Sequence, residues 1–163
     1  VAMTTRREFL KTGLAGGLLL NIAACARPGE NDGRSRVLSA LIPVMLAGAL
    51  SPRPEDAARQ INRTLSGVET AINGLSLATQ KEIGELFDLL AFPLTRMLAA
   101  GLWSPWEEAT PSSLNAFLDS WRHSHFDLLK SGYAALHDLI LGTWYAQPES
   151  WAAIGYPGPP LLK

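Results

Sequence analysis

The residues best able to do chemistry are three histidines and a set of scattered carboxylates. His123 and His125 are two positions apart, so on a helix they would point in different directions and could not bind one metal ion from one face. His137 is followed directly by Asp138, which is equally poor spacing for ligands. The other carboxylates are expected on solvated faces: Glu82, Glu85, Glu107, Glu108, Asp119 and Asp127. We therefore expect no catalytic residue, no metal site and a chain that is not an enzyme.

Composition and motif content exclude further classes of function. The 14 Lys and Arg residues are balanced by 15 Asp and Glu residues, which excludes a nucleic-acid-binding protein that works by bulk electrostatics. The single cysteine excludes an intrachain disulfide and a metal site built from several thiolates. The sequence has no phosphate-binding glycine loop, dinucleotide fingerprint or nucleophile elbow, so we expect this chain to bind no cofactor itself.

Residues 1–24 have the layout of an export signal. The residues at its start resemble the twin-arginine consensus: Arg6, Arg7, Phe9, Leu10 and Lys11. The uncharged run from Thr12 to Ala24 is shorter than the about 20 apolar residues that a membrane-spanning helix needs. We predict that residues 1–24 are a signal peptide that is read by the twin-arginine translocase, a route for folded cargo.

Cys25 ends the segment Ile22-Ala23-Ala24-Cys25, which resembles a bacterial lipobox. In a lipobox the cysteine is acylated and becomes the first residue of the mature protein. The alternative is ordinary cleavage beside an incidental cysteine. We favour lipidation, because an exposed free thiol would be a liability in an oxidising compartment. The sequence then predicts a periplasmic lipoprotein that acyl chains hold on the membrane, with residues 25–36 as a polar tether.

Residues 37–147 have the apolar spacing of helices. Pro54 precedes two acidic residues, a typical helix start, and the first stripe after it has spacings of 3 and 4: Ala58, Ile61, Leu65, Val68 and Ile72. A second stripe extends through Phe87 and Leu90 to Leu94 and Leu98, with Pro93 as a bend. A third, with a bend near Gly132, extends from about 111 to Trp144. We predict an all-α domain, a small bundle of about five helices.

Residues 148–163 form an irregular C-terminal tail that is rich in aromatic residues, Pro and Gly. Trp103, Trp106, Trp144 and Trp151 are predicted in or beside loops. Trp and Tyr are enriched at interface hot spots, and Pro lowers the entropy lost when an extended segment becomes ordered. The tail either folds back on its own domain or docks on another protein, and the pattern favours neither.

The order of these features, ending in W-A-A-I-G-Y-P-G at residues 151–158, resembles the gluconate 2-dehydrogenase subunit 3-like family and the related gamma subunit of bacterial FAD-dependent glucose dehydrogenase. The resemblance implies a non-catalytic small subunit whose partner is an FAD-dependent large subunit of glucose–methanol–choline type, often accompanied by a cytochrome c subunit. The large subunit lacks an export signal, and the small subunit carries it folded through the twin-arginine pore. The residues expected to bind this partner are Trp144, Tyr145, Trp151, Ile154, Gly155, Tyr156, Pro157 and Gly158.

A different class of function stays open beside this one. A free-standing periplasmic lipoprotein could bind an apolar ligand between its helices. Its signature would be a continuous apolar cavity inside the bundle, with the tail packed on its own domain. A cryptic enzyme would instead show converging His and carboxylate groups in a pocket.

Overall fold

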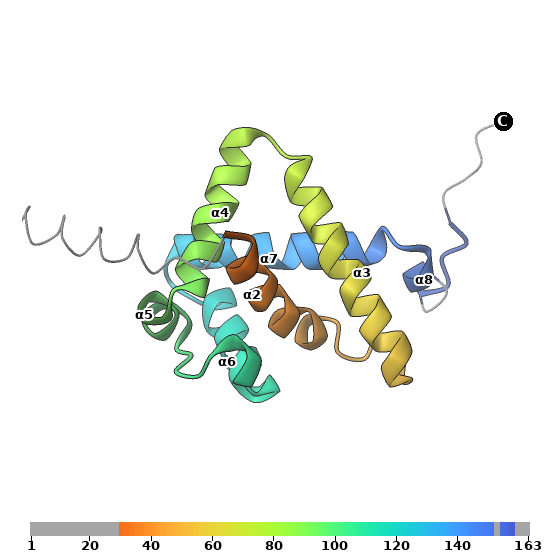
Figure 1. Cartoon of the computed structure of the whole chain (residues 1–163), viewed down its shortest axis with the longest axis horizontal. Coiled ribbons are helices and arrows are strands. Elements are labelled where there is room, and N and C mark those ends of the chain that lie inside the picture. Colours follow the sequence, from red (N-terminus) through yellow and green to blue (C-terminus); the bar gives the residue numbers. More distant parts are fainter. Residues whose placement is uncertain (1–29, 152–153, 159–163) are drawn as a thin grey trace, which may run out of the picture.

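The computed structural model describes residues 30–151 and 154–158, and within these ranges the predicted all-α class is confirmed (Figure 1). The predicted signal peptide, with Arg6, Arg7, Phe9, Leu10 and Lys11, lies outside the described residues, as does Cys25. Five helices are 12 to 20 residues long: α2 Glu30–Met45, α3 Pro54–Asn73, α4 Leu77–Ala91, α6 Pro111–Arg122 and α7 Asp127–Tyr145. The shorter elements are α5 Pro93–Thr95, a π-helical turn Arg96–Ala100, a 3₁₀ turn Trp106–Glu108 and α8 Pro148–Trp151.

The centre of the core is α2, which contacts α3, α4, α6 and α7. Four of its apolar side chains are fully buried, Val37, Leu38, Leu41 and Ile42, and Leu46 directly after the helix is nearly so. The helix begins at Glu30, so residues 30–36, predicted as part of the tether, are helical. Gly33 in this first turn packs closely on α4, because a Cβ atom there would lie 2.9 Å from the Cβ of Ala91.

The start and end of α3 agree with the sequence signals, whereas the second stripe does not continue as expected. Pro54 opens α3, and Gly74 follows its last residue. In the next helix Ile83, Phe87 and Leu90 are buried as the spacing predicts. The helix then stops at Ala91, because the residue before Pro93 is held in an extended conformation. Leu94 and Leu98 therefore lie on separate turns and are exposed to solvent, which corrects the prediction that they continue the stripe.

Three of the five tryptophans are core residues. Trp106 donates a hydrogen bond from Nε1 to the carbonyl of Leu90 (2.9 Å), and Trp121 donates one to the carbonyl of Ala99 (2.7 Å). The ring of Phe117 packs edge-on against both indoles, with ring centroids 5.9 and 4.9 Å away. Trp144 is only 2% exposed. The tryptophan content is therefore largely explained by the core, since a buried indole whose N–H finds an acceptor contributes a large apolar area.

The last long helix, α7, is continuous from Asp127 to Tyr145, so the bend expected near Gly132 is absent. Gly132 instead allows α6 to approach, because a Cβ there would lie 2.6 Å from the ring of Trp121. The break in the third stripe lies earlier, between Arg122 and Asp127. Figure 1 shows α7 extending along the molecule, with its start and α5 at one end and α8 at the other. Among the described helices, none has the length and apolar character needed to cross a membrane.

Candidate functional site

The histidines do not converge on a site. His123 and His125 are exposed, and Nδ1 of His123 lies 3.0 Å from the carbonyl oxygen of Asp119 on its own helix. Nδ1 of His137 lies 3.1 Å from a carboxylate oxygen of Asp138, its neighbour in sequence. Among the residues that the structure describes, no group of three or more His, Cys, Asp or Glu side chains could hold a metal ion.

The carboxylates predicted on solvated faces are exposed, and several form surface ion pairs. Lys81 pairs with Glu85 at 3.7 Å, and Lys130 pairs with Asp127 at 2.8 Å. Exposed pairs of this kind contribute little to stability. Exposed carboxylates in such ion pairs do not identify a general acid or base.

The root of the C-terminal tail is packed on its own domain. Gln147 is nine-tenths buried, and its Nε2 donates to the hydroxyl of Thr64 in α3 (3.1 Å). The hydroxyl of Ser150 donates to the carbonyl of Gln147 (2.7 Å), and Arg63 forms an ion pair with Glu149. These contacts fix α8 against α3 and determine where the tail begins.

Trp151 organises the rest of the described tail. Its Nε1 donates to the carbonyl of Tyr145 (2.8 Å), and its carbonyl accepts the backbone N–H of Tyr156 (3.0 Å). The rings of Trp151 and Tyr156 meet edge to face, with centroids 5.5 Å apart. Gly155 and Gly158 have positive φ of 69° and 101°, which glycine adopts readily. A Cβ at Gly158 would lie 3.0 Å from the Trp151 ring. The described residues of the motif, Trp151 and 154–158, are thus arranged locally around one indole.

This turn leaves apolar side chains exposed at fixed positions. Tyr145, Ile154 and Tyr156 are 43–57% exposed, and we call these three residues the tail surface. Pro157 beside them is also exposed. Trp144, expected to bind a partner, is instead in the core and has no surface to offer. The root of the tail therefore packs on its own domain, while its tip exposes apolar groups.

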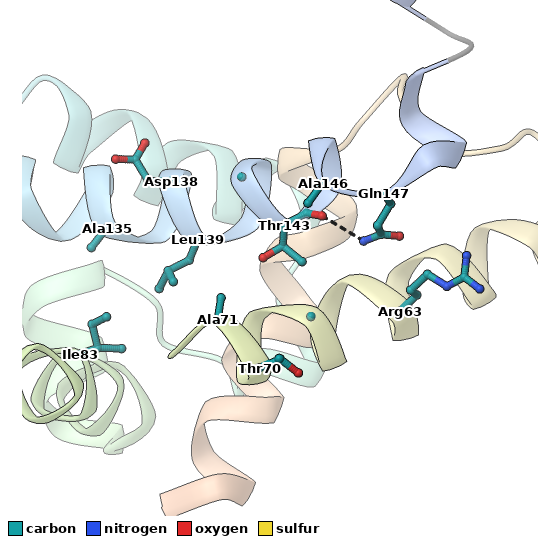
Figure 2. A pocket seen from close by; sticks show the side chains of 12 residues that line it. Arg63, Thr70, Ala71, Ile83, Ala135, Asp138, Leu139, Thr143, Ala146 and Gln147 are labelled. Carbon is teal, nitrogen blue, oxygen red and sulfur yellow. Dashed lines mark hydrogen bonds between the residues drawn. The ribbon is translucent and has the colours of Figure 1, made fainter. Parts of the chain in front are cut away.

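A groove of about 650 Å³ runs between α3 and α7 and reaches Ile83 of α4. Figure 2 shows Ala71 of α3 facing Leu139 and Thr143 of α7 across it. The lining is mainly apolar, and Gly142 leaves space, since a Cβ there would touch nothing within 4 Å. Gln147 closes one end of the groove, and its Oε1 is buried without a hydrogen-bond partner.

Sequence reasoning missed a second group of exposed apolar side chains. They lie around α5 and the start of α7: Leu94, Leu98, Trp103, Phe126 and Leu128. Pro93 was the available signal, because the extended residue before a proline ends a helix and changes the direction of the next segment. Periodicity alone assigned Leu94 and Leu98 to the core.

Comparison of the chain with family models, with curated proteins and with solved structures found no match. Support for a function therefore comes from the motifs of the chain and from the geometry of the described residues.

Proposed function

We propose that this chain is the non-catalytic small subunit and twin-arginine export escort of a periplasmic FAD-dependent dehydrogenase of glucose–methanol–choline type. FAD belongs to the large subunit, and in the families that the chain resembles a cytochrome c subunit often accompanies the pair. Arg6 and Arg7 address the complex to the translocase. Acyl chains on Cys25 then hold the complex at the membrane.

The tail surface is the observation that carries the proposal. Tyr145, Ile154 and Tyr156 are exposed although Trp151 and Gln147 fix the backbone that bears them. A preorganised apolar surface loses little conformational entropy on binding, so more of its contact energy becomes affinity. Aromatic side chains at the centre of an interface are common hot spots. These properties suit a site that must hold a folded partner during export.

The experiment is co-expression of this chain with the flavoprotein encoded by the neighbouring gene, followed by co-purification and measurement of bound FAD. We expect the flavoprotein to be retained by the native chain and lost with the double variant Ile154→Ser, Tyr156→Ser. Leu77→Ser is the matched control, because Leu77 is 84% exposed and lies at the start of α4, away from the tail. A chain that never retains a flavoprotein would overturn the proposal.

A second candidate function is supported by the groove between α3 and α7. A free-standing periplasmic lipoprotein would use these about 650 Å³ for an apolar ligand, which is within the usual size range of ligand sites. Binding of a fatty acid to the purified chain would favour this function. The variant Gly142→Leu would then fill the groove and abolish binding of the fatty acid.

A further inference from the structure

Five large apolar side chains are exposed on α5, the π-helical turn and the loop after it, and around the first turn of α7, and Figure 1 shows α5 and the start of α7 at the opposite end of the molecule from α8. Each is 57–79% exposed, and we call the group the apolar end: Leu94, Leu98, Trp103, Phe126 and Leu128. Single exposed apolar residues are ordinary on protein surfaces, whereas a group of large ones marks a surface that something covers. None of the five side chains is buried in the bundle core, and none belongs to the tail.

The core brings the two sequence segments of the apolar end together. Trp121 donates to the carbonyl of Ala99 in the π-helical turn, and its ring packs against Gly132 near the start of α7. Leu98 precedes Ala99 in that turn, and Phe126 and Leu128 are the residues around the first turn of α7. Figure 1 shows α5 and the start of α7 at the same end of the molecule.

Trp103 is placed by the loop after the π-helical turn. Leu102 beside it is buried, and Nε of Arg96 donates to its carbonyl (3.3 Å). Leu102 is thus held in the core, whereas the adjacent Trp103 indole is exposed to solvent. Asp127, between Phe126 and Leu128, is paired with Lys130 at 2.8 Å, so these charges offset one another.

The start of α2 lies beside the same end. Gly33, in the first turn of α2, packs against Ala91, two residues before α5 begins. From Cys25 to Glu30 the chain has five steps, which extend over at most about 18 Å. A lipid on Cys25 would therefore keep this end of the domain close to the bilayer.

We propose that the apolar end is a membrane-docking surface whose occupant is the interfacial region of the lipid bilayer; this rests on the proposed lipid anchor at Cys25. Trp103 suits that region, because indoles are enriched where headgroups meet acyl chains. Leu98, Phe126 and Leu128 add apolar contact, as on surfaces that lie flat on a membrane. Contact between the apolar end and the bilayer gives the lipid-anchored domain a defined orientation on the membrane.

The orientation leaves the tail surface free for the flavoprotein. Phe126 directly precedes α7 and Tyr145 is its last residue, and this helix of 19 residues is about 28 Å long. The membrane and the flavoprotein therefore occupy opposite ends of the bundle. Neither has to displace the other.

The test attaches the chain from Cys25 to Lys163 to vesicles of phosphatidylethanolamine and phosphatidylglycerol that contain a maleimide lipid. Cys25 is the only cysteine, so coupling occurs at one place, and this chain keeps every buried side chain of the described core, from Val37 to Trp144. The readout is quenching of tryptophan fluorescence by lipids brominated on their acyl chains. We expect quenching in the native chain and its loss in Trp103→Phe.

Matched variants separate the apolar end from other exposed apolar residues. Leu98→Ser and Leu128→Ser should reduce the quenching of Trp103, whereas Leu77→Ser should leave it unchanged. Absence of lipid quenching in the tethered native chain overturns the inference. So does protection of Trp103 by the flavoprotein in the absence of lipid, which would make the apolar end a protein interface.

Artificial coupling keeps this test independent of the proposed function. Mass measurement of the chain purified from cell membranes shows separately whether Cys25 carries acyl groups. An unmodified Cys25 would refute the anchor in the proposed function, while quenching of Trp103 in the coupled chain would still support the lipid affinity of the apolar end.

Discussion

The indole N–H of Trp151 donates to the backbone carbonyl of Tyr145, 2.8 Å away. This single bond ties the turn at residues 151–158 to the end of α7, and it holds Tyr156 beside the indole. The donor lies in α8 and the acceptor is the last residue of α7. The hydrogen bond therefore fixes the shape of the tail surface without contributing to the core.

The variant Trp151→Phe should weaken retention of the flavoprotein with little effect on folding. It keeps an aromatic ring beside Tyr156 but loses the hydrogen bond to Tyr145, so the tail surface loses its fixed shape. We expect at least roughly tenfold weaker binding, or about 1.4 kcal/mol, and a loss of no more than about 1 kcal/mol in the free energy of unfolding. Titration with the flavoprotein and urea denaturation measure the two effects. Unchanged binding would contradict a role for this turn.

Substitution of Gly132 by Ala should destabilise the domain, because the new Cβ would lie 2.6 Å from the Trp121 ring. Such overpacking typically costs about 1–3 kcal/mol. Gly142→Ala on the same helix is the control, since its Cβ meets nothing within 4 Å, and we expect it to stabilise by up to about 1 kcal/mol. Thermal and urea denaturation compare the two variants. Equal effects at both positions would show that α6 and α7 are not in close contact.

Arg34 should matter more to stability than Arg36 on the same helix. Arg34 is largely buried, pairs with Glu69 at 2.9 Å, and has its guanidinium 5.6 Å from the ring centroid of Phe87. The pairs of Arg36 are longer and exposed, at 3.6 and 3.7 Å. Arg34→Met leaves the Glu69 carboxylate without its partner and should cost about 1–3 kcal/mol, whereas Arg36→Met should stay within about 0.5 kcal/mol. Urea denaturation at low and high salt measures both, and a larger loss at Arg36 would refute the ranking.

Replacing Arg6 and Arg7 by Lys should leave both this chain and the flavoprotein in the cytoplasm. The export receptor reads the arginine pair, and the flavoprotein is proposed to have no signal of its own. Cell fractionation with immunodetection of both proteins measures the result, with dehydrogenase activity in the periplasm as a second readout. A flavoprotein that still reached the periplasm would contradict the escort role.

Local signals in the sequence predicted the helical class and several boundaries. Pro54 and Gly74 determine the ends of α3 because a proline suits the first turn and a glycine follows the last. Ser76 caps α4 by accepting from the backbone N–H of Thr79. These features depend on a few neighbouring residues, so a single sequence is enough to find them.

Features that depend on packing between helices could not be found in this way. The role of Gly132 depends on the position of Trp121, which belongs to another helix. Likewise, Gly33 indicates a loop by composition but lies in α2, where it packs closely on Ala91 of α4. Trp144 resembled an interface residue because it lies near a helix end, yet its face of α7 points into the bundle.

The central position of α2 has a consequence for the order of synthesis. Every described helix that contacts α2 comes after it along the chain: α3, α4, α6 and α7. Until α7 has left the ribosome, α2 lacks part of its cover. A stalled chain that lacks α7 therefore presents the apolar side chains of α2 incompletely covered. In the folded chain these side chains are buried. Exposure of α2 would therefore distinguish a chain that lacks α7 from one that contains it.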